Sequence, residues 1–176
     1  MKLFRKIVIL TILFIIFSFE PNDDYDNPSD YEAVIMYRDD LEKSISIGDP
    51  QPLTGLDKIY YKDDYIFLTK RYKGMHVIDN HDPENPVNIA FINIPGCQDV
   101  AIKQNILYSD NSTDLVGINI SGIPASIAQV SRIAKAFPNP LPPDLDYIPK
   151  KFRAYNRPKN TVIVEWKKKP VSNSVY

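Results

Sequence analysis

Short runs of alternating apolar and polar residues dominate the chain from residue 58 onward. Four segments rich in Ile, Val, Tyr and Phe have this period of two, which is typical of half-buried β-strands. They cover residues 58–61, 65–70, 74–79 and 87–94. The intervening segments have the residue chemistry of turns and comprise residues 63–64, 72–74 and 82–86. We therefore predict four short strands joined by turns.

The flanking regions carry weaker patterns. Residues 31–37 predict a short strand, and residues 39–45 fit either a short helical turn or an extended lead-in. Five prolines between residues 138 and 149 predict an extended connector, because proline lacks the N–H that a helix requires. Residues 161–166 are a strong strand candidate, followed by a polar tail that opens with three lysines.

The strand pattern repeats along the chain at a constant offset, which aligns residues 61–67 with residues 102–108. The further pairs matched by this 41-residue offset are Met75 with Val116, Val77 with Ile118, Pro83 with Pro124, and Ile92 with Ile133. Four strands in roughly 40 to 45 residues make one propeller blade, and β-branched segments of period two argue against a helical solenoid. We therefore predict two blade-like units, residues 58–98 and 99–139.

These patterns together predict an all-β fold, a partial β-propeller-like array of about two four-stranded antiparallel blades plus an extended C-terminal segment. The other predicted segments are a signal peptide or short membrane tether (1–19), an acidic linker (20–30), a lead-in (31–57), and a Pro-rich connector with strand and basic tail (140–176). About 146 residues follow the linker, or roughly 3.5 blades, whereas propellers typically close with about 4 to 8. We therefore expect an open, truncated array.

Residues 1–19 predict export. Three basic residues precede an apolar run over residues 7–17, and acidic residues follow from Glu20. A helix of this length spans about 16 Å, roughly half of the ~30 Å hydrocarbon core, so the pattern favours a secretory signal over a transmembrane helix. No small-x-small cleavage triplet follows, so an uncleaved membrane tether is the alternative. We expect a periplasmic or cell-envelope location.

Composition narrows the function classes. A formal net charge of −1 argues against whole-chain binding to nucleic acid, and a single cysteine excludes a disulfide framework and a multi-thiolate zinc site. Charge is nonetheless segregated, with 13 acids and 4 bases in residues 20–64 and 9 bases and 3 acids in residues 133–176. Mutual attraction between the two ends is one interpretation, and a basic tail that contacts acidic glycans or lipids is the other.

Several motifs resemble a known family. Residues 74–86 read GMHVIDNHDPENP and residues 94–102 read IPGCQDVAI. With residues 106–110 and 114–120, they resemble the LVIVD-repeat family of bacterial cell-envelope β-propellers, mostly lipoproteins without an assigned enzymatic role. The likeness runs over about residues 31–166 and implies a non-enzymatic envelope role. Relatives are several blades longer and usually carry a lipid-accepting cysteine after the signal, where Phe19 stands here, so this chain departs from the family at the two features that lipidation and full closure require.

One histidine cluster resembles a metal site. His76, Asp79, His81 and Asp82 lie within seven residues. His76 lies on a predicted strand, whereas His81 lies in the following turn, so one ion would require a sharp fold-back of the chain. Asp82 before a proline is better explained as a turn-initiating residue that bonds the local backbone. We therefore predict a structural turn and no metal or cofactor.

Nucleophilic catalysis has one candidate, Cys97. It follows Pro95 and Gly96 between two predicted strands, and a Cys97–His76 pair would make the protein an envelope enzyme. A packed, inert thiol is the default interpretation. The dispersed glycines form no phosphate-binding loop. We therefore predict no catalytic residues.

Tyrosines provide the best binding candidates. Tyr60, Tyr61, Tyr65 and Tyr72 cluster in the first unit, where they would either form a recognition surface or pack between blades. We predict an exported, non-enzymatic LVIVD-repeat-type module that binds or scaffolds an envelope protein or glycan, with self-association as a further option and no nucleic-acid partner. The alternatives are a truncated propeller relic without independent function and the enzyme based on Cys97 and His76.

Overall fold

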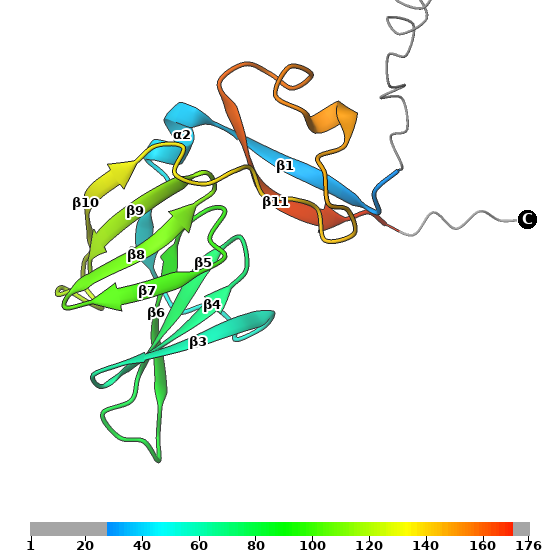
Figure 1. Ribbon diagram of the computed structural model, residues 1–176. Helices are drawn as coiled ribbons and strands as arrows, with labels where there is room; N and C mark the ends of the chain where they lie inside the picture. The colour runs from blue at the N-terminus through cyan, green and yellow to red at the C-terminus, as the bar shows by residue number, and fades with distance from the viewer. Residues whose placement is uncertain (1–27, 171–176) are drawn as a thin grey trace, which may run out of the picture.

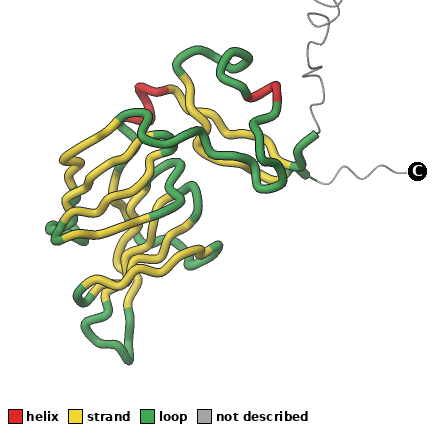
Figure 2. Tube along the Cα trace, viewed as in Figure 1, coloured by secondary structure: helices red, strands yellow, loops and turns green. Residues whose placement is uncertain are grey.

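The computed structural model describes residues 28–170, so the predicted signal, most of the acidic linker and residues 171–176 lie outside the described part. Residues 28–170 form an all-β fold, as predicted, with antiparallel sheets of five, four and two strands. Within this range, helix is confined to α2 (Arg38–Glu42) and the 3-10 turn η1 (Lys150–Phe152) (Figure 2). In the described range, no helix is long and apolar enough to cross a bilayer.

The first sheet has the strand order β2-β6-β5-β4-β3 (Figure 1). Its strands are β2 (Ser46–Gly48), β3 (Leu56–Lys62), β4 (Tyr65–Lys70), β5 (Gly74–Asp79) and β6 (Val87–Asn93). The four predicted strands are confirmed as β3 to β6, and β4 and β5 have the predicted bounds. The lead-in contributes β2 as a fifth strand, which the sequence did not predict.

The second sheet repeats the plan of the first. Its order is β10-β9-β8-β7, from β7 (Val100–Lys103), β8 (Ile106–Asn111), β9 (Asp114–Asn119) and β10 (Ala128–Ile133). Asp63 and Gln104, which the repeat offset aligns, both have positive φ in the turn after the first strand of their hairpin. The register shifts leave Ile89 and Val130 as the unpaired bulge residues, and the same offset aligns these two. The two sheets therefore share turn geometry and bulge position.

The 41-residue offset fails in one strand. Pairing of Lys70 with Gly74 leaves three residues in the β4–β5 turn, whereas pairing of Asn111 with Asp114 leaves two in the β8–β9 turn. Along β5 and β9 the structural offset is therefore one shorter. The equivalents of Met75 and Val77 are Leu115 and Gly117. Val116 and Ile118 lie on the other face of β9, so the predicted matches of Met75 with Val116 and of Val77 with Ile118 were wrong.

The main core lies between the two sheets, which pack through one face each, here called their inner faces. The inner face of the first sheet carries Tyr60, Phe67, Met75, Val77 and Ile92. The inner face of the second carries Ile102, Leu107, Val116 and Ile118. The structural equivalents of the first group are Ala101, Tyr108, Leu115, Gly117 and Ile133, which lie on the opposite, outer face of the second sheet. The sheets therefore stack in one direction, as successive units of a repeat array do.

Residues 49–55, here called the strap, cross the outer face of the first sheet, because they join β2 at one edge to β3 at the other. Two side chains of that face hold the strap. The Asn88 amide donates to the Gln51 carbonyl at 2.8 Å, and the Lys70 ammonium lies 3.4 Å from Thr54 Oγ1. His76, on the same face, has no exposed surface.

The third sheet, here called the terminal ribbon, pairs β1 (Tyr31–Tyr37) with β11 (Thr161–Lys168). Both strands were predicted, but their pairing was not. Lys151 of the segment before β11 contacts Glu32 of β1 at 2.9 Å, in line with the predicted attraction between the two ends. Trp166 is buried and donates from Nε1 to the Pro140 carbonyl at 2.9 Å, so β11 also anchors the Pro-rich connector.

A buried carboxylate joins the ribbon region to the second sheet. Asp114 Oδ2 accepts from Arg38 at 2.6 Å and from Arg132 at 2.7 Å, and Asp114 Oδ1 accepts from the Lys135 N–H at 3.0 Å. Burial raises the pKa of Asp114, but these bonds together outweigh it and hold the pKa below its usual value. The charge pairs therefore fix the β8–β9 hairpin against the segment that follows β1.

Candidate functional site

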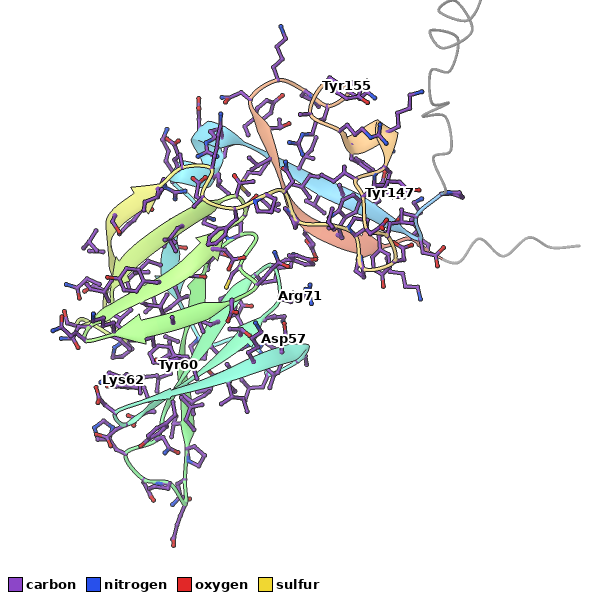
Figure 3. The ribbon with its side chains drawn as sticks, in the orientation of Figure 1. Asp57, Tyr60, Lys62, Arg71, Tyr147 and Tyr155 are labelled. Atoms are coloured by element: carbon purple, nitrogen blue, oxygen red, sulfur yellow. The ribbon has the colours of Figure 1, made fainter. Side chains whose placement is uncertain are left out.

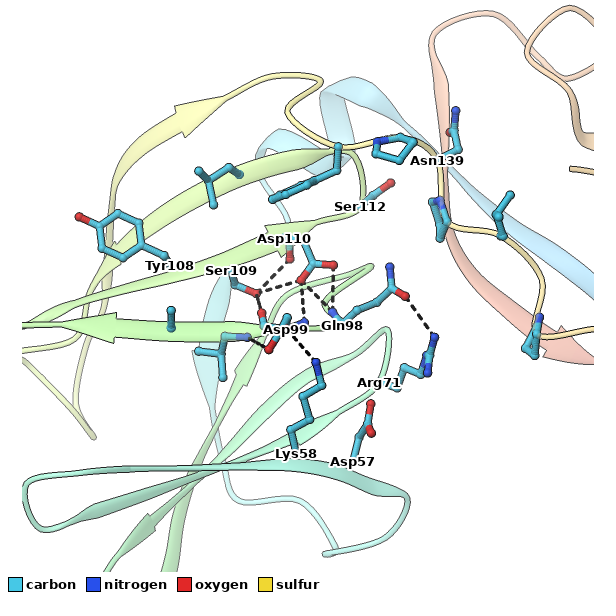
Figure 4. A pocket seen from close by; sticks show the side chains of 18 of the residues that line it. Asp57, Lys58, Arg71, Gln98, Asp99, Tyr108, Ser109, Asp110, Ser112 and Asn139 are labelled. Carbon is cyan, nitrogen blue, oxygen red and sulfur yellow. Dashed lines mark hydrogen bonds and ion pairs between the residues drawn. The ribbon is translucent and has the colours of Figure 1, made fainter. Parts of the chain in front are cut away.

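An open groove of about 820 Å³ lies on the outer face of the second sheet (Figure 4). Its floor includes Ala101 of β7, Tyr108 of β8 and Leu115 of β9. One wall is the segment from Phe137 to Pro143, and the opposite rim comes from the first sheet and its loops. Sequence reasoning missed this groove, although the repeat places Tyr108 at the position of the buried Phe67 and so marks it as a packing position.

The Pro-rich wall is held in place from behind. The Pro140 carbonyl accepts the Trp166 indole N–H, and the Phe137 N–H donates to the Thr113 carbonyl at 2.9 Å. Pro140 and Pro142 are buried, whereas Phe137 and Leu141 are 41% and 45% exposed. Since proline also restricts φ, the wall presents apolar side chains on a stiff backbone.

Charged side chains on the rim pair with their neighbours. Lys58 Nζ lies 2.7 Å from Asp99 Oδ2, and Arg71 donates to Gln98 Oε1 at 3.3 Å. The hydrogen bond to Asp99 raises the pKa of Lys58, and the same bond lowers the pKa of Asp99. Asp57 lies beside Lys58 on the rim (Figures 3 and 4). The charges of Lys58 and Asp99 on the rim are therefore paired with each other, whereas Arg71 bonds a neutral amide.

Asp110 organises one end of the groove. Its carboxylate accepts from the N–H groups of Gln98 at 2.8 and 3.0 Å and of Asp99 at 2.9 Å (Figure 4). Burial raises the pKa of Asp110, and these backbone hydrogen bonds oppose the rise. The carboxylate thus fixes the loop before β7, and its oxygens accept hydrogen bonds from the backbone of that loop.

Cys97 belongs to this loop, and its side chain lies in the core. It is fully buried, and its Sγ contacts Ser109 Oγ at 3.2 Å. Burial raises the pKa of the thiol to about 12, so the thiol is protonated at neutral pH. Because the thiolate is the nucleophilic form, this environment opposes the role that the enzyme alternative assigns to Cys97.

The two histidines lie in different environments. His76 is buried on the outer face of the first sheet, edge-on to Phe91 at 4.9 Å between ring centroids. Burial and the nearby Lys70 lower the pKa of His76. His81 is exposed, and its Nδ1 lies 2.7 Å from Asp79 Oδ1, a hydrogen bond that raises the pKa of His81.

The segment after His81 is a structural turn. The Glu84 N–H donates to Asp82 Oδ1 at 3.1 Å, and the Asn85 amide donates to Asp82 Oδ2 at 2.8 Å. The prediction that Asp82 initiates a turn by bonding the local backbone is confirmed. In residues 28–170, no three or more His, Cys, Asp and Glu side chains converge as metal ligands would.

The four candidate tyrosines do not gather on one surface. The Tyr60 hydroxyl donates to the Ile102 carbonyl at 3.0 Å, which places Tyr60 between the two sheets. Tyr65 packs edge-on to His81, and Tyr72 is 7% exposed. Tyr61, at 61%, is the one clearly exposed member of the four. The predicted recognition surface therefore reduces to Tyr61, and packing between sheets or within loops accounts for the other three.

Comparison with protein-family models, curated proteins and solved structures finds no match for this chain. The resemblance to the LVIVD-repeat family therefore stays a prediction from the quoted motifs. Any function has to be inferred from the groove and its surroundings.

Proposed function

We propose that the protein is an exported, non-enzymatic binding or scaffolding module of the bacterial cell envelope, of LVIVD-repeat type, whose groove receives an apolar polypeptide segment of a partner protein. One observation carries the proposal. The groove has an apolar floor and wall, while Lys58 on its rim is paired with Asp99 and the Asp110 carboxylate accepts backbone N–H groups of the protein itself. A glycan would need free polar groups for its hydroxyls, so this chemistry favours a polypeptide.

The structural equivalence of the two sheets supports the same choice. Tyr108 and Leu115 occupy the positions of Phe67 and Met75, which are buried against a neighbouring sheet. The groove floor therefore has the residue pattern of a surface that packs against protein. Large exposed apolar areas on soluble proteins are typical of such contacts.

Site-specific photo-cross-linking tests this function in cells that export the protein. A benzophenone amino acid is placed at Leu141 in the groove wall and, as a matched control, at Tyr155, which is 71% exposed in the loop before β11 (Figure 3). We expect polypeptide adducts at position 141 and none at position 155. Equal adducts at both positions, or glycan adducts at position 141, would contradict the proposal.

Export has its own test. Fusion of residues 1–30 to a reporter that is active only outside the cytoplasm is expected to give activity that is lost when Lys2, Arg5 and Lys6 are replaced by Glu. A fusion that stays inactive would place the module in the cytoplasm and remove the envelope from the proposal, while leaving the groove as a binding site.

A further inference from the structure

The joint between the two sheets shows what the outer face of the second sheet is built to receive. Within the chain, the inner face of the first sheet packs against a sheet face formed by Ile102, Leu107, Val116 and Ile118. The strand registers place the residues equivalent to these four on the outer face of the first sheet, at Tyr61, Ile66, His76 and Ile78. Each end of the two-sheet stack therefore carries one half of the joint that lies between the sheets.

Both halves have exposed apolar residues. On β3, Ile59 and Tyr61 are 74% and 61% exposed, whereas their equivalents in the joint, Val100 and Ile102, pack into the core. On the second sheet, Tyr108 and Ile133 are 37% and 58% exposed. Exposed apolar residues at positions that are buried in the equivalent joint are unfavourable in an isolated chain, and contact between the two ends would cover them.

One residue pair is also complementary in size. In the joint within the chain, Tyr60 of the first sheet reaches over Ile102 of the second, with the hydroxyl on the Ile102 carbonyl at 3.0 Å. At the free ends the equivalents are Ala101 and Tyr61. The tyrosine thus lies on the opposite side of the contact, because Ala101 stands at the position of Tyr60 and Tyr61 stands at the position of Ile102. The space beside Ala101 in the groove therefore corresponds to the position that Tyr61 of a following sheet would take.

From these observations we propose that a second copy of this chain fills the groove, with Ile59 and Tyr61 on β3 of one copy packed beside Ala101 and Tyr108 of the next. The contact is head to tail, so each copy uses a different end, and association continues until a ring closes or a filament grows. This inference rests on the proposed function of the groove and names its occupant.

The strap limits the size of the contact. It crosses the outer face of the first sheet, where His76 and Phe91 are 0% and 3% exposed, and reaches Lys70 of β4, whereas Ile59 and Tyr61 on β3 stay exposed. The intermolecular contact is therefore smaller than the joint within the chain. Interfaces below about 1,200 Å² are commonly transient, so we expect association that depends on protein concentration.

Two single variants of the full chain test the head-to-tail arrangement. Tyr61→Glu blocks the β3 end and keeps the groove, whereas Ala101→Glu blocks the groove and keeps the β3 end. We expect the wild-type chain to form a concentration-dependent series of species in native mass spectrometry, each variant alone to be monomeric, and an equimolar mixture to form a dimer but nothing larger. Tyr155→Glu, a control at another exposed tyrosine, is expected to behave as the wild type.

Cross-linking gives a second readout. Because Cys97 is buried, new thiols are the accessible ones in residues 28–170. Mixing Tyr61→Cys chains with Ala101→Cys chains under mild oxidation is expected to give heterodimers in excess over both homodimers. Preferred Tyr61→Cys homodimers would indicate a symmetric contact and overturn the arrangement.

The remaining outcomes also decide the question. A wild-type chain that stays monomeric at all concentrations overturns the inference, as does association that survives in both Glu variants, which would point to the apolar N-terminal run. If the chain is monomeric but position 141 still cross-links to a different polypeptide, the groove function stands and only its assignment to a second copy fails.

Discussion

Phe67 and Tyr108 occupy the same position in two sheets of the same plan, yet Phe67 is 1% exposed and Tyr108 is 37% exposed. The first sheet buries this face against the second, whereas the second sheet turns the equivalent face toward the groove. The neighbouring positions differ only in part, because Val77 and Ile92 in the covered face correspond to Gly117 and Ile133 in the uncovered face. The aromatic side chain of Phe67 therefore stabilises the core, whereas that of Tyr108 is available for binding.

Truncation of the two aromatic side chains is expected to have very different effects on stability. Phe67→Ala removes a buried ring from the core and is expected to lower the free energy of unfolding by about 3–5 kcal/mol, since both transfer and cavity costs apply. Tyr108→Ala is expected to cost about 1 kcal/mol or less and to remove cross-linking at the groove. Denaturant titration of both variants measures the difference, and equal losses would show that Tyr108 is a core residue.

Asp114 and Asp99 offer a second contrast, between a buried and an exposed ion pair near the groove. Asp114→Ala leaves Arg38 and Arg132 without their buried partner, so we expect a loss of about 3–5 kcal/mol in the free energy of unfolding. Asp99→Ala breaks the exposed pair with Lys58 and is expected to cost about 1 kcal/mol or less. Chemical denaturation tests both values. A small loss for Asp114→Ala would mean that the hairpin is held by packing alone.

His76 provides the smallest and most specific test, because its equivalent in the second sheet is the apolar Val116. Both ring nitrogens of His76 are buried without a hydrogen-bond partner, so His76→Leu is expected to raise the free energy of unfolding by roughly 1 kcal/mol at pH 7.

The pH dependence of stability separates the two histidines. The pKa of His76 is lowered on folding, so its contribution is fully present above the unfolded pKa of about 6.5 and is lost as pH falls below it, by at most about 1.4 kcal/mol per pH unit. The His76→Leu variant should lack this loss. The pKa of His81 is raised, so His81→Asn should instead remove stability that is present at acidic pH and disappears as pH rises. Urea titrations between pH 5 and 8 measure both, and identical profiles in all three proteins would contradict the assignment.

The local fold could be predicted because its signals are local. Alternation and turn chemistry define β4 and β5 at their observed bounds, and the repeat offset places β8 and β10. The offset fails in β9 because the hairpin turn at residues 112–113 is one residue shorter than its counterpart. A one-residue change exchanges the two faces of a strand, so apolar identity alone did not distinguish Leu115 from Val116.

The candidate site could not be predicted in the same way, because it is assembled from distant segments. The Pro-rich wall is placed by Trp166, whose strand pairs with residues 31–37 at the other end of the described chain. No short-range pattern encodes that pairing. The predicted tyrosine surface could not be judged from the sequence for a related reason, because Tyr60 contacts Ile102 only once the two sheets have stacked.

Pairing of β1 with β11 also brings the two ends of the described chain to one corner of the molecule. The Lys169 N–H donates to the Asp30 carbonyl at 2.8 Å, and Lys169 Nζ reaches the Ser29 carbonyl at 2.7 Å. A membrane tether or a fused domain attached beyond either end of the described chain therefore starts from this corner. The terminal ribbon stands between that corner and the two stacked sheets (Figure 1). A label fused after Lys169 would therefore leave the fold beside any attachment made before Ser29.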